Sequence, residues 1–223
     1  MTKSELLRIA KPILFNTDMV RAILDDRKTA TRRAVKGAIT LSPESEHKVC
    51  FFPYKVRKDR GRVIRSIQYF TLESFTEREA PFHKGDILYV RESGIIQSMK
   101  NFDKRVKIYF PADDSLVEFK VTPDEYERLS KFPENKKISP YWLTKQESRI
   151  FLKVTDVRVE RLQDMETIDD RNYISEGAKD KHDFIHIWDA TVKDKEKYEK
   201  YGWYANPWVW VIEFERIREN GRD

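Results

Sequence analysis

The sequence predicts an α+β fold. Candidate strands and candidate helices are grouped separately along the 223 residues, without the regular β-α-β alternation that builds a parallel sheet. Aromatic residues make up 13% of the chain, so their large side chains can supply a core despite a charged fraction of 36%. The length fits one large domain or two small ones, and we expect a single domain over 1–223.

The first expected elements are a short strand and a helix. Residues 12–15 (PILF) form an apolar run typical of a buried strand, and residues 16–18 (NTD) are types that cap helix N-termini. Apolar side chains then recur at helical spacing within residues 19–24. The helix should stop near residues 25–26, where two aspartates oppose the helix dipole, and Asp26 should adopt the left-handed conformation.

The middle of the chain predicts further strands. Residues 49–53 and 63–75 have strand character, with a basic turn between them, and a Gly-Asp turn leads into a strand over 87–92. The stretch KRVKIYF at 104–110 is also strand-like, and a helix is expected after Pro123.

The best strand candidate lies between residues 149 and 162. Its apolar side chains change parity at residues 155–156, which predicts a β-bulge or a strand bending around a barrel. Residues 167–170 resemble a capping box that opens a helix, and Gly177 is placed to end it. A final strand is expected over 207–214. Its tryptophans, isoleucine and phenylalanine alternate onto one face, which we expect to be buried in the core because an exposed apolar stripe would invite aggregation.

Charge and cysteine content narrow the functional classes. The formal net charge is +5 and the pI about 9.1, a mild excess that favours polyanionic partners. Cys50 is the single cysteine, which excludes an intrachain disulfide and a thiolate zinc cage and favours a reducing compartment. No apolar run approaches membrane-spanning length, and the N-terminus lacks a signal-peptide core. We therefore expect a cytoplasmic protein with no membrane partner.

Three segments together resemble the ASCH family. They are the first helix followed by DRKTATRR at 26–33, the GDIL turn and strand at 85–88, and the strand over 149–159 leading to ISEG at 174–177. Their order and spacing match the family from about residue 12 to residue 215. The stretches KPILFNTDMVRAIL, GDILYVRES and NPWVWVIEF are similar, more narrowly, to ASCH-like proteins of phages and prophages.

This resemblance implies a PUA-like β-barrel with flanking helices and a cleft beside the first helix. Residues 36–80 and 94–148 fall outside the match and are expected to be insertions. The second of these lacks a dense apolar pattern of its own, so we interpret it as an elaboration of the barrel rather than a separate domain.

ASCH proteins are associated with RNA, and some are enzymes. One bacterial branch removes the acetyl group of N4-acetylcytidine with a lysine, a threonine and a glutamate. Its K-T-x-T-x-R motif matches Lys28, Thr29, Thr31 and Arg33, and Glu176 is the best match for the glutamate. Asp26 stands where a glycine is usual, and the chain is about twice as long as the small amidohydrolases. Another branch is reported to cleave RNA with help from a metal.

The chemistry of these residues is consistent with that role under one condition. A threonine hydroxyl needs a base to become a nucleophile, and a lysine can act as one when burial or nearby cations lower its pKa. Lys28 and Thr31 have opposite parity in an extended segment, so they converge only if a turn intervenes at residues 29–30. Glu176 would orient the lysine or carry a proton. Alternatively, Lys28, Arg32 and Arg33 form a cationic patch and Thr31 is an ordinary strand residue.

Further candidate binding residues surround the expected cleft, each with a structural alternative. Arg91 and Glu92 end a strand and either contact a ligand or close the barrel rim as ion pairs. Asn206 lies just before the last strand and either hydrogen-bonds a base edge or caps a loop. Trp208 lies near the start of that strand. Between residues 55 and 65 lies a basic hairpin beside aromatic residues, which predicts phosphate binding or a solvated loop. Its candidate binding residues are Arg57, Lys58, Arg60 and Arg62.

His182 and His186 share a spacing that can bind metal, but they lack the glutamate of HExxH, so we predict no metal site and no cofactor. The favoured function is binding of RNA or a modified nucleoside, with DNA possible and hydrolysis of an acylated cytidine as the candidate reaction. A metal-assisted ribonuclease, or a non-enzymatic phage accessory protein acting through a protein partner, stays open as an alternative.

Overall fold

The computed structural model describes residues 3–36, 40–41, 49–53, 57–59, 62–64, 67–166, 170–192 and 194–218, and between 40 and 70 it describes the main chain alone. The α-helices are α1 Lys3–Ile9, α2 Thr17–Leu24, α3 Leu72–Glu79, α4 Pro123–Ser130, α5 Arg171–Ser175, α6 Lys181–Ala190 and α7 Lys195–Tyr201. Short 3₁₀ turns are η1 Pro140–Trp142, η2 Lys145–Glu147, η3 Leu162–Met165 and η4 Trp203–Ala205. None of the helices in these ranges has the length and apolarity needed to cross a bilayer.

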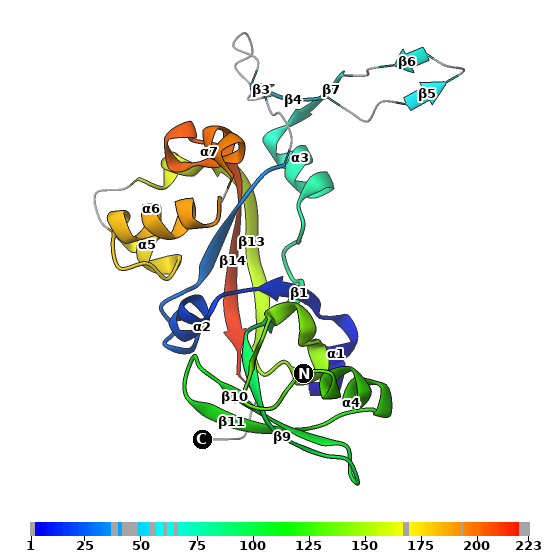
Figure 1. Ribbon diagram of the computed structural model, residues 1–223. Helices are drawn as coiled ribbons and strands as arrows, with labels where there is room; N and C mark the ends of the chain where they lie inside the picture. Colours follow the sequence, from blue (N-terminus) through cyan, green and yellow to red (C-terminus); the bar gives the residue numbers. More distant parts are fainter. Residues whose placement is uncertain are drawn as a thin grey trace.

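A five-stranded sheet forms the centre of the molecule (Figure 1). Its strands, in spatial order, are β1 Lys11–Leu14, β8 Ile87–Arg91, β13 Phe151–Arg161, β14 Trp208–Ile217 and β2 Ala30–Ala34. Only the β1–β8 pair is parallel. The predicted α+β class is confirmed, but the predicted closed barrel is wrong for the described strands. The chain runs from edge strand β1 through α2 into edge strand β2, so a helix rather than a hydrogen-bonded ladder connects the two edges.

The two long strands β13 and β14 carry the main core. Their register shifts between Val154 and Asp156, which confirms the predicted bulge. On β14 the apolar side chains predicted to be core are at most 8% exposed and pack with β1, β8 and α2. Val209 and Val211 lie on the other face, in a second cluster with residues of α5 and α6. Figure 1 shows these helices on one side of β13 and β14.

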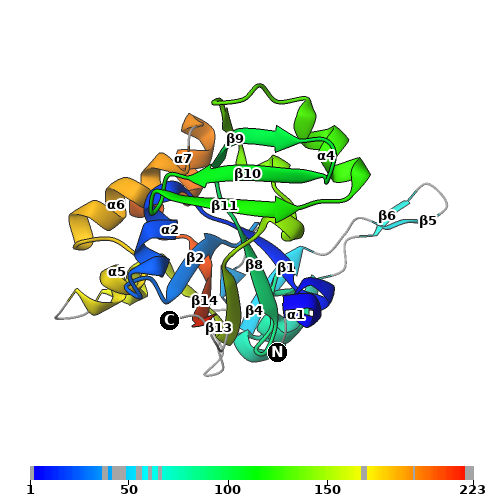
Figure 2. The same ribbon diagram turned by 90° about the horizontal axis from the view of Figure 1, so that it is seen from below.

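The stretch from 94 to 148 has an apolar cluster of its own, which the sequence analysis did not anticipate. It holds the antiparallel strands β9 Gly94–Lys100, β10 Arg105–Phe110, β11 Ser115–Lys120 and β12 Lys137–Ile138, in the order β11-β10-β9-β12. In Figure 2 the three longer strands lie side by side next to α4. The cluster takes one to three residues from each of several elements, such as Ile96, Phe119 and Leu129. No single segment therefore shows a dense apolar pattern, and β9 and β11 were not predicted.

The stretch from 40 to 79 contains more and shorter strands than predicted. It contains β3 Thr40–Leu41, β4 Val49–Pro53, β5 Arg57–Asp59, β6 Arg62–Ile64 and β7 Ile67–Thr71. The strand expected to run to residue 75 ends at Thr71, where α3 begins. The Thr71 hydroxyl accepts a hydrogen bond from the Ser74 amide at 3.1 Å and so caps the helix. Phe75 then lies in the core, stacked on Trp210 with 5.0 Å between ring centroids.

Candidate functional site

The turn after α2 directs Lys28 into the protein. The Asn16 carboxamide caps the helix by accepting from the Met19 amide at 2.8 Å. At the other end Asp26 has φ 55°, the predicted left-handed conformation. The amides of Arg27 and Lys28 both donate to the Ala22 carbonyl at 2.9 Å, so the chain folds back on the helix before β2 begins.

This turn lies earlier than the sequence hypothesis required. A turn was expected at residues 29–30, but the Thr29 amide donates to the Ser175 carbonyl and the Thr29 carbonyl accepts from the Phe214 amide. Ala30 already belongs to β2, opposite Glu213 of β14. The segment is therefore bound on both sides by neighbouring backbone, and the chain reverses at Asp26 instead.

Lys28 and Glu176 meet although 148 residues separate them. The Lys28 ammonium donates to the Glu176 carboxylate at 3.2 Å, and to the backbone carbonyls of Glu176 and Ala30 at 2.7 Å each. The side chains are 0% and 6% exposed. The structure therefore brings together two of the three predicted catalytic residues.

Gly177 makes this approach possible at the end of α5. The helix ends at Ser175, as predicted, and Gly177 has φ 87°, a conformation that other residues rarely adopt. A Cβ there would lie 3.1 Å from the Cβ of Ala22 and 3.3 Å from the Cδ of Lys28. The glycine thus allows close contact between the end of α5 and the turn after α2. Residues 167–169 of the predicted capping box are outside the described residues.

A chain of ion pairs leads from Glu176 to the surface. Arg32 donates to Glu176 at 3.0 Å and to Glu160 at 2.8 Å, and its side chain is 3% exposed. Arg158 then pairs with Glu160 and Glu213 at the exposed end. Sequence reasoning placed Arg32 only in a cationic patch and missed Glu160, although alternating charged residues on β13 were a usable signal.

The surroundings of Lys28 lower its pKa below the ordinary 10.5. Burial is the main cause, because an ammonium loses its hydration in the interior. The charge of Glu176 and its hydrogen bond oppose this effect, whereas the charges of Arg33 and Arg32 add to it. A lysine in this setting loses its proton more easily than a solvated one.

Thr31 lies on the apolar face of β2. It is 5% exposed and pairs in register with Ile212, whose side chain belongs to the main core. Arg32 points to the opposite face, as neighbours on a strand do. Within the described residues, the Thr31 hydroxyl makes no hydrogen bond with Lys28 or Glu176, so the third predicted catalytic residue is not joined to the other two.

Arg91 and Glu92 are both engaged with other parts of the protein. Arg91 Nε donates to the carbonyls of Pro140 at 3.0 Å and Leu143 at 3.1 Å. Glu92 is 4% exposed and accepts two hydrogen bonds from Arg149, at 2.7 and 2.9 Å. Glu92 therefore forms an ion pair, as in the structural alternative. Arg91 instead holds the loop that contains Pro140 and Leu143.

Asn206 and Trp208 also contact other parts of the protein. Asn206 has φ 44°, and its side-chain oxygen accepts from the Gln163 amide at 2.8 Å, which is the loop-capping alternative. Trp208 is 8% exposed, with the Arg161 guanidinium 4.6 Å from the ring centroid. In the described part of the chain its indole N–H has no acceptor.

For the residues of the predicted basic hairpin, the structure describes at most the main chain. Arg57 and Lys58 pair in register with Ile64 and Val63, so the predicted hairpin forms at the level of the main chain. Arg62 pairs with Asp59, and Arg60 lies outside the described residues. His182 and His186 are exposed on α6. Across the described ranges, no group of three His, Cys, Asp or Glu side chains is arranged to hold a metal ion.

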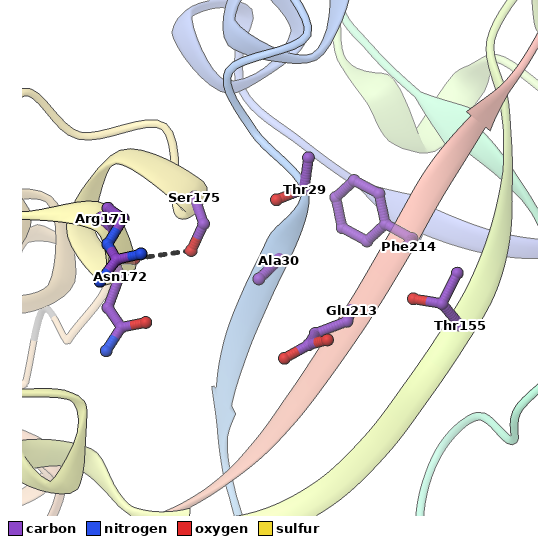
Figure 3. Close-up of a pocket in the computed structure, with 8 residues that line it drawn as sticks. All are labelled: Thr29, Ala30, Thr155, Arg171, Asn172, Ser175, Glu213 and Phe214. Atoms are coloured by element: carbon purple, nitrogen blue, oxygen red, sulfur yellow. Dashed lines mark hydrogen bonds between the residues drawn. The ribbon is translucent and has the colours of Figure 1, made fainter.

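A pocket of about 310 Å³ lies between α5 and the start of β2 (Figure 3). It is lined by Thr29, Ala30, Thr155, Arg171, Asn172, Ser175, Glu213 and Phe214. Thr29 and Ser175 adjoin Lys28 and Glu176 in sequence, and the Ser175 hydroxyl donates to the Asn172 carbonyl at 2.8 Å. The three predicted catalytic side chains do not line this pocket. Of its lining residues, only Thr29 belongs to the motif that the sequence analysis singled out.

Comparisons of the chain with models of protein families, with curated proteins and with solved structures found no match. Its interpretation therefore depends on its own residues and their geometry.

Proposed function

We propose that the chain is an ASCH-like, cytoplasmic domain that binds RNA or a modified nucleoside and hydrolyses the acyl group of an N4-acylated cytidine. One observation carries this proposal: the contact between the Lys28 ammonium and the Glu176 carboxylate. The family resemblance implies a catalytic lysine and glutamate at these two positions, and a random pair of residues so far apart in sequence has no reason to meet in the interior.

The environment of Lys28 supports acid–base chemistry. Its lowered pKa favours a neutral amine that can take a proton from a nucleophile. Glu176 accepts a hydrogen bond from the ammonium form, so it can orient the lysine and stabilise the proton before it passes to the leaving amine. Thr31 stays the candidate nucleophile, because hydrogen bonds between catalytic groups often form only with substrate bound.

The decisive experiment measures hydrolysis of N4-acetylcytidine by chromatography of cytidine. We expect turnover by the wild type and a loss of roughly 10²- to 10⁴-fold in Glu176→Gln and Lys28→Met, the range for removing an acid or base. Thr31→Val tests the nucleophile with little change in shape. Arg27→Gln is the matched control, since this exposed neighbour pairs only with Asp25 among the described residues.

Full activity in both Glu176→Gln and Lys28→Met would exclude this catalytic centre. RNA cleavage that a chelator abolishes would favour a metal-assisted ribonuclease instead. Absence of binding to any nucleoside or RNA in a panel would favour an accessory protein that acts through protein partners.

The hairpin of β5 and β6 is proposed to contact phosphates through Arg57, Lys58, Arg60 and Arg62. RNA affinity should then fall as salt rises, because bound cations displace counterions from the backbone. Replacing Arg57 and Arg62 with glutamine should make that dependence shallower. A flat salt response in both proteins would remove the hairpin from the proposal.

A further inference from the structure

The segment around η1 exposes two neighbouring aromatic side chains. Tyr141 is 71% exposed and Trp142 is 50% exposed. Both belong to the expected insertion 94–148, to which the sequence analysis gave no function. Single exposed apolar side chains are common, but neighbouring exposed rings form an apolar patch of the kind that often marks a binding site.

Arg91 fixes the position of Tyr141. In addition to its bonds to the carbonyls of Pro140 and Leu143, Arg91 donates to the Tyr141 carbonyl. The guanidinium carbon lies 5.7 Å from the centroid of the Tyr141 ring, in the range of a cation–π contact. One side chain therefore holds the backbone of the turn and also supports the ring, while most of the ring surface stays open to solvent.

A series of contacts connects this turn with the Lys28–Glu176 pair. Arg91 is the register partner of Leu14 in the β1–β8 pair, and its carbonyl accepts from the Phe15 amide at 3.2 Å. The Lys28 ammonium lies 5.4 Å from the centroid of the Phe15 ring. The C-terminal ends of β1 and β8 thus bring η1 and Lys28 to the same end of the sheet.

Arg33 lies near the same strand end. Its guanidinium donates to the Leu14 carbonyl at 3.1 Å. Although Arg33 keeps exposed surface, the protein atoms around its guanidinium partly desolvate it and lower its pKa, and the charges of Glu176 and Tyr141 oppose this lowering. By surface area Arg33 and Tyr141 are exposed, whereas Lys28 and Glu176 are buried. A ligand approaching from solvent would therefore meet Arg33 and Tyr141 first.

We propose that Tyr141 is the base-stacking residue of a nucleoside site whose polar floor is the Lys28–Glu176 pair. This inference rests on the proposed function and names the residue that holds the base. An aromatic ring already fixed in place can stack on a pyrimidine at little entropic cost, and base stacking does not depend on hydrogen-bond pattern. Arg33 would lie beside the bound ligand.

Trp142 provides a matched control on the same turn. Its ring packs edge-on against Phe132, with centroids 5.1 Å apart and an interplanar angle of 61°. Its carbonyl accepts from Arg128 of α4. Trp142 therefore faces the core of the 94–148 region, and its removal should leave the nucleoside site intact.

Calorimetry with N4-acetylcytidine and cytidine compares the wild type with Tyr141→Ala, Tyr141→Phe and Trp142→Ala. We expect Tyr141→Ala to weaken binding by roughly 10- to 100-fold, the usual cost of losing one stacked base. Tyr141→Phe keeps the ring and Trp142→Ala keeps Tyr141, so both should bind within about twofold of the wild type. Photocrosslinking with 5-iodocytidine should place the adduct on Tyr141. Circular dichroism establishes that each variant is folded.

The outcomes separate the inference from the function on which it rests. Wild-type binding combined with equal affinity in Tyr141→Ala would overturn the inference and leave the proposed function standing. An equal loss in Trp142→Ala would show a general disturbance of the turn, which also overturns it. A wild type that binds neither nucleoside would overturn the inference and the nucleoside part of the proposed function, and RNA binding would then be tested separately.

Discussion

Two buried ion-pair centres in this molecule differ in the balance of their charges. In one centre Glu176 forms an ion pair with Lys28, and in the other Glu92 forms an ion pair with Arg149. Both carboxylates are at most 6% exposed, and each cation comes from a distant part of the chain. Arg149, however, has a second carboxylate, Asp113, at 2.6 Å. Glu176 instead shares its charge between two cations, Lys28 and Arg32.

This balance moves the pKa values of the two cations in opposite directions. Burial acts to lower the pKa of Arg149, but the hydrogen bonds that Arg149 donates to Glu92 and Asp113 outweigh it and raise the pKa. For Lys28 burial prevails over Glu176, and Arg33 and Arg32 add to the lowering. A cation with two carboxylates is fixed as a structural element, whereas a lysine that shares one carboxylate can exchange its proton.

The largest effect should follow removal of Arg149. In Arg149→Met the buried Glu92 loses its partner, which typically costs about 3–5 kcal/mol of unfolding free energy. Urea denaturation measures this loss. Arg149→Leu should behave in the same way, because any apolar replacement leaves the charge of Glu92 unpaired. A loss below about 1 kcal/mol would mean that Glu92 is protonated or solvated and would remove the contrast between the centres.

Lys28→Met should be milder for stability. Arg32 still pairs with Glu176 in this variant, so the carboxylate keeps a cation while the cost of burying Lys28 disappears. We expect a change of about 1 kcal/mol or less by the same denaturation assay, together with loss of hydrolysis. A loss as large as that of Arg149→Met would show that Lys28 serves stability instead.

The two centres also differ in how far the sequence revealed them. Lys28 and Glu176 were found because a family motif marked them. The left-handed conformation of Asp26 was predicted, but the sequence did not show that Thr29 and Ala30 continue without a turn into β2, because the backbone partners of Thr29 come from Ser175 and Phe214, far away along the chain. Glu92 was noticed, but Arg149 was not named as its partner, since nothing local specifies which distant cation an acidic side chain will meet.

The same limit applies to the fold. The α+β class, the bulge at residues 154–156 and the buried face of β14 follow from local periodicity, which a short segment carries by itself. Closure of the sheet and the separate cluster of residues 94–148 depend on which segments pack together. The closure was mispredicted and the cluster was not anticipated, because pairing between distant segments leaves no pattern within either one.

The pH dependence of Lys28 tests the charge balance directly. Glu176 raises the pKa of Lys28, so Glu176→Gln should lower it further and move the rising limb of activity to lower pH. Arg33 lowers that pKa, so Arg33→Gln should move the limb to higher pH. Nuclear magnetic resonance of ¹³C-labelled lysine gives the same pKa without activity, with Lys28→Met assigning the signal. Shifts in the same direction for both variants would contradict this account.

The smallest effect concerns stability in alkaline solution. Because the folded state lowers the pKa of Lys28 below its unfolded value of 10.5, the unfolded chain binds this proton more tightly. The cost of the buried charge is complete below the folded pKa and vanishes as pH rises to 10.5. The wild type should therefore gain stability relative to Lys28→Met across that window, by at most about 1.4 kcal/mol per pH unit. A relative loss would mean that Glu176 outweighs burial, and Lys28 would then resemble Arg149.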